Sequence, residues 1–237
     1  MSEMSEMGEM SSIPAWLTPV SWFFVAIAAL SAAFIAYDIV VRGHRQRNTA
    51  MNVVWPATGL YLGPLAVWAW MRYGRLRSER WQTGHGPSPE KDLSTAALTG
   101  GTPGGFASLV GHIIGVPLIV LSGVTLAGLD LWAMIAAVAV IATAILFAYE
   151  FFFSTVPSRR LSGGRGVGVA ALIAVATVLA FDIGMGGWML FLHFGWVMPG
   201  VTDVEFLFLM QVGLILGFLT GYPMVRFLVA RGVKAVA

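Results

Sequence analysis

The chain of 237 residues contains no cysteine and few charged side chains. Because there is no cysteine, a disulfide, an iron–sulfur cluster and a thiolate metal site are all excluded, and only Asp, Glu, His and Met remain as metal ligands. Charged residues make up 11% of the chain and hydrophobic residues 57%, so a soluble fold would leave much apolar surface exposed to water. The composition therefore favours an integral membrane protein, in which the 28 glycines are also common.

The sequence also lacks the motifs of common enzyme classes. It has no GxSxG, no HExxH, no phosphate-binding loop and no dinucleotide fingerprint, and the glycine clusters at 100–105 and 163–166 lack a strand–turn–helix setting. The basic residues lie beside the ends of apolar segments instead of forming one extended patch. We therefore expect neither an enzyme nor a nucleic-acid partner.

Long apolar runs occupy most of the chain. A span needs about 20 mostly apolar residues to cross roughly 30 Å of hydrocarbon. The sequence predicts an all-α polytopic membrane bundle at 15–237, with a flexible Met/Glu-rich tail at 1–14 and a mobile cytoplasmic loop, rich in Gly, Pro and Ser, at 73–105. The six predicted spans are 15–41, 51–71, 106–127, 131–156, 167–194 and 204–229.

The basic residues orient these spans. With the C-terminus cytoplasmic in a bacterial-type inner membrane, 11 of the 14 Lys and Arg residues lie inside, as the positive-inside rule requires. The three arginines at 42–47 are the exception, since six full spans would place them outside. The second segment contains Pro56, Gly63 and Pro64, which break or kink a helix. It is either a kinked full span or a re-entrant segment that returns to the side it left.

Three stretches of the chain resemble a known family. They read MNVVWPATGLYLGPLAVWAWMRYGR at 51–75, FDIGMGGWM at 181–189 and MQVGLILGFLTGYPM at 210–224, followed by Gly232, Val233 and Lys234. They are similar to an uncharacterised prokaryotic membrane family described as domain of unknown function 4396. The resemblance implies a fold type and no activity. Some relatives are associated with multicopper oxidases, which implies a link to copper.

One stretch departs from the family pattern. The family tends to have cysteines and an acidic residue in the stretch that matches 104–115, which would suit a metal. This chain has Ala107, Ser108 and His112 there. A metal role implied by the resemblance therefore lacks its sulfur ligands in this chain.

The strongest candidate site is a stripe on the fifth predicted span. At 100° per residue, Asp182, Met185, Met189 and His193 fall within about 80° of one another. Thioether and imidazole ligands suit copper, especially Cu(I), and the carboxylate could relay protons. In the alternative interpretation the two methionines fill core space and Asp182 hydrogen-bonds a neighbouring helix.

Other polar residues extend this stripe into a possible cation or proton path. Gln211 lies at a depth comparable with Asp182 and is its expected partner. Nearer the cytoplasm, His112 and Glu150 each lie about two helical turns from an inner helix end and could pair. Alternatively His112 is a satisfied buried histidine and Glu150 reaches an interfacial arginine.

Glycines repeat at every fourth position in two predicted spans. They are Gly213, Gly217 and Gly221 in the last span and Gly111 and Gly115 in the third. This spacing allows close helix packing, either within the bundle or between subunits. Besides lipids, we therefore expect other membrane protein subunits or further copies of the chain as partners.

Methionines and glutamates alternate in the N-terminal tail. Its residues Met1, Met4, Met7 and Met10 are interleaved with Glu3, Glu6 and Glu9. Such a tail is either a flexible thioether cluster that captures Cu(I) or a disordered polar segment. Because a signal peptide would carry positive charge here, we expect the first span to be retained.

Two functions remain open. In the first, the protein binds or conducts a small cation, copper or a proton, along the Asp/Met/His face of the fifth span. In the second, it is a noncatalytic accessory or scaffold subunit of a larger membrane complex, for example a redox enzyme.

Overall fold

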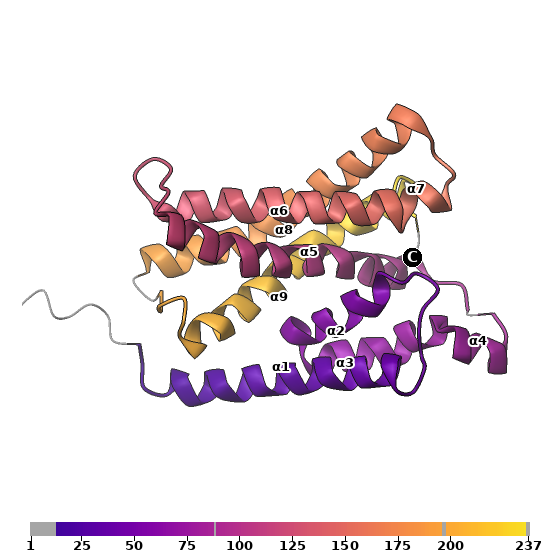
Figure 1. Cartoon of the computed structure of the whole chain (residues 1–237), viewed down its shortest axis with the longest axis horizontal. Coiled ribbons are helices and arrows are strands. Elements are labelled where there is room, and N and C mark those ends of the chain that lie inside the picture. Colours follow the sequence, from indigo (N-terminus) through magenta and orange to yellow (C-terminus); the bar gives the residue numbers. More distant parts are fainter. Residues whose placement is uncertain (1–12, 88, 196–197, 236–237) are drawn as a thin grey trace, which may run out of the picture.

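The computed structural model describes residues 13–87, 89–195 and 198–235 (Figure 1). Within these ranges all regular secondary structure is helical. Five helices are long and apolar enough to cross a membrane, which indicates a multi-pass membrane protein. They are α1 (Leu17–Val40), α5 (Leu93–Ser122), α6 (Asp130–Phe152), α8 (Gly163–Phe194) and α9 (Val204–Ala230).

The second apolar segment is divided into short pieces instead of one continuous helix. At Gly63 the backbone has φ 54° and ψ −130°, a conformation that essentially only glycine adopts, and Pro64 starts a new helix immediately afterwards. The pieces are α2 (Met51–Leu62), α3 (Pro64–Ala69), a π-helical turn (Trp70–Gly74) and a 3₁₀ turn (Arg75–Arg77). The structure thus contains five long apolar helices where the sequence predicts six spans.

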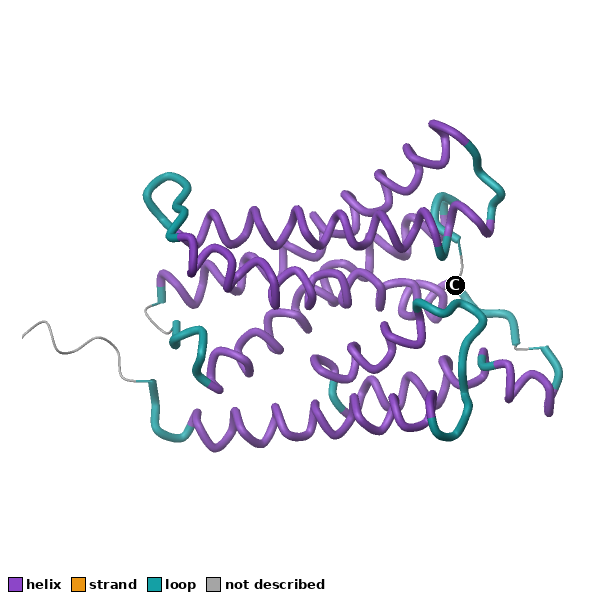
Figure 2. Tube along the Cα trace, in the orientation of Figure 1, coloured by secondary structure: helices purple, strands orange, loops and turns teal. Residues whose placement is uncertain are grey.

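The pieces α2 and α3 form a helical hairpin. Both outer ends lie at the end of the molecule where α1 finishes, and the connection between them lies near its middle (Figures 1 and 2). Gln46 Nε2, before α2, donates to Gly74 O, after α3, at 2.9 Å. Inside the hairpin the Trp55 and Trp70 rings pack edge to face, with centroids 5.5 Å apart. The chain therefore leaves the hairpin at the end where it entered.

Helix α5 begins earlier than the sequence predicts. Its first residue is Leu93, with Asp92 capping the Thr95 N–H at 3.3 Å, so the loop predicted for 73–105 is wrong in extent. A short helix, α4 (Glu79–His85), occupies part of the remaining connection. The first turns of α5 are rich in glycine and threonine. Their mean hydropathy is therefore too low to predict that they belong to a long buried helix. They nevertheless pack tightly, because a Cβ at Gly105 would lie 2.1 Å from the Tyr61 hydroxyl.

The glycines of α9 form its contact with α8. A Cβ at Gly213 would lie 2.3 Å from Met185 Sδ, and one at Gly217 would lie 2.3 Å from the Phe181 ring. At Gly221 the Phe181 ring is 3.5 Å away, an ordinary contact. The two helices therefore approach closely only because side chains are absent at the first two positions.

The glycines of α5 make the corresponding contact with α6. Cβ atoms at Gly111 and Gly115 would lie 2.9 and 3.1 Å from atoms of Val138. Both glycine series predicted from the sequence therefore pack against helices of the same chain.

Candidate functional site

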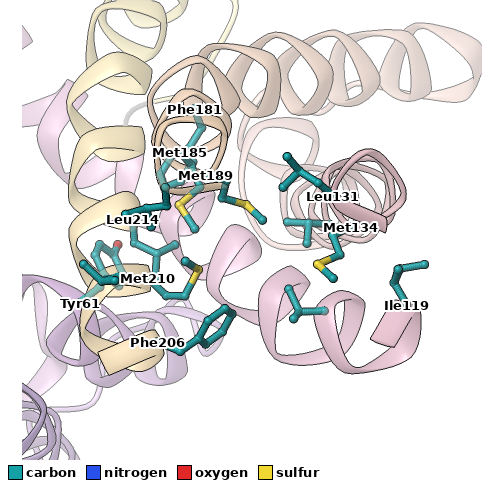
Figure 3. Packing of buried hydrophobic residues seen from close by; sticks show 14 of the residues in the cluster. Tyr61, Ile119, Leu131, Met134, Phe181, Met185, Met189, Phe206, Met210 and Leu214 are labelled. Atoms are coloured by element: carbon teal, nitrogen blue, oxygen red, sulfur yellow. The ribbon is translucent and has the colours of Figure 1, made fainter. Parts of the chain in front are cut away.

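The predicted stripe on α8 is divided between two environments. Met185 and Met189 are each 1% exposed and belong to an apolar cluster with Phe181 and Leu214, as Figure 3 shows. Asp182 is half-buried and lies outside this cluster. His193, at the end of the helix, is also half-buried. The carboxylate and imidazole thus do not join the two thioethers inside the bundle.

The apolar cluster gathers methionines from three helices. Met134 of α6 and Met210 of α9 belong to it together with Met185 and Met189. Across the described parts of the chain, no group of three or more His, Asp or Glu side chains is arranged to hold a metal ion. Any metal in this cluster would therefore depend on thioether sulfur.

Asp182 has no partner among the described residues. Its side chain makes no hydrogen bond or ion pair with any of them. The space next to it is open, since a Cβ at Gly186 or Gly187 would meet nothing within 4 Å. The partner predicted from the sequence is wrong, because Gln211 Nε2 instead donates to Leu60 O at the hairpin tip, at 2.9 Å.

Glu150 is completely buried and fully paired. Lys234 Nζ, from the segment after α9, donates to Glu150 Oε1, and Thr155 Oγ1 donates to Oε2 at 2.6 Å. Arg159 Nη2 holds the same segment by donating to Lys234 O at 3.2 Å. The predicted pairing of His112 with Glu150 is therefore wrong. Sequence reasoning includes Lys234 in the charge count and in the family resemblance but assigns it no partner, and hydropathy does not reveal one because Lys234 follows the last span.

His112 is buried on α5 with one ring nitrogen unused. The side chain is 7% exposed, and its Nδ1 lies 2.8 Å from Ser108 O on the preceding turn. Nε2 has no hydrogen-bond partner among the described residues. A buried polar atom without a partner is uncommon in proteins and marks a place where a bound molecule could supply one.

The His112 ring lines a cavity of about 620 Å³ between α1, α5, α9 and the hairpin tip. Leu60 at that tip and Gln211 of α9 close one side of it. The remaining wall is mainly apolar and includes Ala28, Leu109, Val116, Phe206, Met210 and Leu214. A cavity of this size and character suits a small organic molecule.

A second polar cluster joins the hairpin to the end of α1. The Asp38 carboxylate is 1% exposed; it accepts from Trp70 Nε1 at 2.9 Å and lies 3.4 Å from Arg42 and 3.7 Å from Arg75. Arg75 Nε in turn donates to His44 Nε2 at 3.0 Å. Burial and then the charge of Arg75 lower the pKa of His44 below its ordinary 6.5. Sequence reasoning treated the arginines of this cluster as topology signals and did not single out Asp38.

Comparison with known proteins gives one match. A model described as a domain of unknown function (DUF4396) matches residues 95–234, from the first turns of α5 through Lys234. No curated protein and no solved structure matches the chain. The match covers more than half of the 237 residues. The chain therefore belongs to the DUF4396 family, whose function is unknown.

Proposed function

We propose that the protein is an accessory subunit of a larger membrane complex, and that the side of α8 carrying Asp182 binds a membrane helix of another protein. The observation that carries this proposal is the half-buried Asp182 carboxylate, which has no partner among the described residues. Inside a membrane such a group is costly, and it normally faces a partner or water. A donor from another subunit would remove that cost.

The surface around Asp182 suits a partner helix. Ile183, next to it, is 72% exposed, and the exposed Gly187, where an added Cβ would meet nothing within 4 Å, allows a close approach of helix backbones. Small residues beside a polar one are the usual features of helix contacts in membranes. The expected partner therefore presents a basic or amide side chain at this depth.

A second copy of the chain does not supply such a cation. All 14 Lys and Arg residues belong to segments at one end of the bundle, at 42–47, 72–91, 159–165 and 226–234. Asp182 follows Arg165, the nearest of them along α8, by 17 residues, a rise of about 26 Å. A basic partner for Asp182 must therefore come from a different protein.

The same distribution of charge supports a topology of five spans with α2 and α3 as a re-entrant hairpin. A full span at 51–71 would separate the arginines at 42–47 from the others, whereas a hairpin keeps all of them on one side. In a bacterial-type inner membrane this side, with the C-terminus, is cytoplasmic, and Ala15 lies on the opposite side.

Cross-linking in native membranes tests the subunit proposal. A photoreactive residue at Ile183 should form one discrete adduct with a second protein, and Asp182→Asn should reduce that adduct at least tenfold. The matched control is a photoreactive residue at Leu121, which is 87% exposed on α5 and should give no such adduct. An adduct that is unchanged in Asp182→Asn, or that contains two copies of this chain, would reject the proposal.

The topology has its own test, which the absence of cysteine simplifies. Single cysteines at Ala15 and Ala235 are labelled with a membrane-impermeant maleimide in intact cells and then in inverted vesicles. Five spans with a re-entrant hairpin place the two cysteines on opposite sides. Labelling from the same side would instead mean that the segment at 51–71 crosses the membrane.

Binding of Cu(I) is the second candidate function. It is favoured by the four methionines that meet in one cluster, Met134, Met185, Met189 and Met210, because thioethers are soft ligands that suit Cu(I). Metal analysis of protein purified after Cu(I) loading should then find copper that Met185→Leu with Met189→Leu removes. Equal copper in the two preparations would reject this function and leave the methionines a packing role.

A further inference from the structure

We infer that the cavity between α1, α5, α9 and the hairpin tip binds an uncharged lipophilic alcohol whose hydroxyl group donates a hydrogen bond to His112 Nε2. This site is separate from the Asp182 face of α8 and does not depend on the subunit proposal. The argument combines the tautomer of His112, the other polar atoms of the cavity wall and the depth of the site in the membrane.

The tautomer of His112 is fixed by its own helix. Ser108 O is a carbonyl oxygen and can only accept, so Nδ1, 2.8 Å from it, must carry the proton. In the neutral ring Nε2 then has a lone pair and no hydrogen. The His112 ring lines the cavity, and its buried Nε2 has no partner among the described residues, so this nitrogen is the acceptor that the ring can offer to a bound molecule.

The cavity wall offers further acceptors besides His112 Nε2. Gln211 Nε2 donates one hydrogen to Leu60 O, and the Gln211 amide oxygen has no hydrogen-bond donor among the described residues, so it can accept from a ligand. Pro117 lies inside α5 and has no N–H to donate to Ile113 O one turn earlier, and both residues line the cavity. A ligand that donates a hydrogen bond fits these acceptors, and the Thr202 hydroxyl, which also lines the cavity, can either donate or accept.

The depth of His112 argues against ordinary phospholipid. His112 precedes Ser122, the last residue of α5, by 10 residues, which is about 15 Å along the helix. That is half the thickness of the hydrocarbon layer, so the imidazole lies near its middle. Moving a charged headgroup into this region costs a large desolvation free energy. A hydroxyl group can enter it when a hydrogen-bond acceptor is present to compensate for its lost hydration.

The cavity is equally unsuited to a bare cation. Its described lining contains no Asp or Glu, and most of its surface comes from Leu, Val, Ile and Phe side chains. A cation would lose its water and gain one imidazole, one thioether and an amide oxygen at best. An apolar molecule fills the same space by contact with hydrocarbon side chains.

A pair of matched probes tests the inference. Farnesol and farnesyl methyl ether have the same apolar chain, but only farnesol has a hydroxyl group to donate. The full-length protein in lipid nanodiscs is labelled with a diazirine analogue of farnesol, and each probe is titrated as a competitor. Farnesol should compete at about tenfold lower concentration than its ether, the factor expected for one hydrogen bond to a buried acceptor.

Two variants make the test specific for His112. His112→Phe keeps a ring but removes the acceptor, so the farnesol-to-ether ratio should fall to about one. His112→Gln keeps an acceptor and should retain part of the preference, while the exposed His85→Phe should leave the ratio unchanged. If His112→Phe does not fold, the farnesol-to-ether ratios of the wild type and of His112→Gln still test the inference.

Three results would overturn the inference. They are equal competition by the two probes in the wild type, no competition by either probe, and a preference for farnesol that survives His112→Phe. The Ile183 cross-link is measured separately in the same His112→Phe variant. Failure of the alcohol-binding inference is therefore distinguishable from failure of the subunit proposal.

Discussion

Two buried acids at the basic end of the bundle are paired with cations, and the acid in the middle of α8 is not. Asp38 and Glu150 are buried at that end, and each lies against Lys or Arg side chains of the same chain. Asp182 lies deeper in the bundle and has no partner among the described residues. The fold thus supplies counter-ions to the two acids that hold segments together, and none of the described residues does the same for Asp182.

The largest effect is expected from separating Lys234 and Glu150. Lys234→Met leaves a buried carboxylate without its cation, which should lower the free energy of unfolding by about 3–5 kcal/mol. Denaturant unfolding of the protein in detergent measures this change in the free energy of unfolding. The double variant Glu150→Leu with Lys234→Met removes both charges and should recover most of the loss. If Lys234→Met were as stable as the wild type, the pair would not be structural and the comparison would fail.

The next largest effect concerns the two sides of α8. Gly217→Ala places a methyl group 2.3 Å from the Phe181 ring and should destabilise the α8–α9 contact, by about 1–3 kcal/mol. Gly187→Ala is the matched control, because nothing lies within 4 Å of the added atom; it should change stability by no more than about 0.5 kcal/mol. Equal losses in the two variants would mean that the Asp182 side of α8 is packed as tightly as the α9 side.

Asp182→Leu should affect stability much less than the loss of Lys234. The carboxylate makes no bond within the described chain, so its replacement by an apolar side chain should leave the isolated protein within about 1 kcal/mol of the wild type. Thermal unfolding of the purified protein checks this. A loss as large as that of Lys234→Met would show that Asp182 has an internal partner after all.

The smallest effect is a pH dependence at the basic end. His44 Nδ1 lies 3.1 Å from Ser78 Oγ, which donates its own proton to Arg75 O, so His44 donates from Nδ1 and accepts from Arg75 at Nε2. Because the folded pKa is below the unfolded value of 6.5, the unfolded state takes up a proton first as pH falls. Stability should therefore be full above pH 6.5 and decline below it.

Limited proteolysis between pH 8 and pH 5 measures this decline in the connections at 41–50 and 75–80. His44→Gln does not titrate and should flatten the profile. A profile that is the same in this variant and the wild type would assign the pH dependence to other groups.

Hydropathy predicted the long helices well where apolar runs end at polar or helix-breaking residues. The predicted spans 167–194 and 204–229 agree with α8 and α9 to within a few residues. It failed at the start of α5, where Gly100, Gly101 and Gly104 are buried because they are small and not because they are apolar. Close packing of small residues carries little hydropathy signal.

The candidate site was only partly predictable. Helical periodicity groups Asp182 with Met185 in one stripe, but Met185 packs in the apolar cluster and Asp182 lies outside it, because the neighbours of each side chain depend on which helices cross there. The salt bridge of Glu150 depends on the chain turning back after α9, which no local pattern indicates. The hairpin was predictable as an alternative, because Gly63 followed by Pro64 is a strong helix break.

The position of Lys234 also orders the assembly of the protein. Glu150 belongs to α6, whereas its cation follows every apolar helix and is synthesised after all of them. Until translation reaches that point, a newly inserted polypeptide holds an uncompensated acid at the margin of the bilayer. A ribosome product that stops before residue 234 lacks the cation and keeps Glu150 without its ion pair.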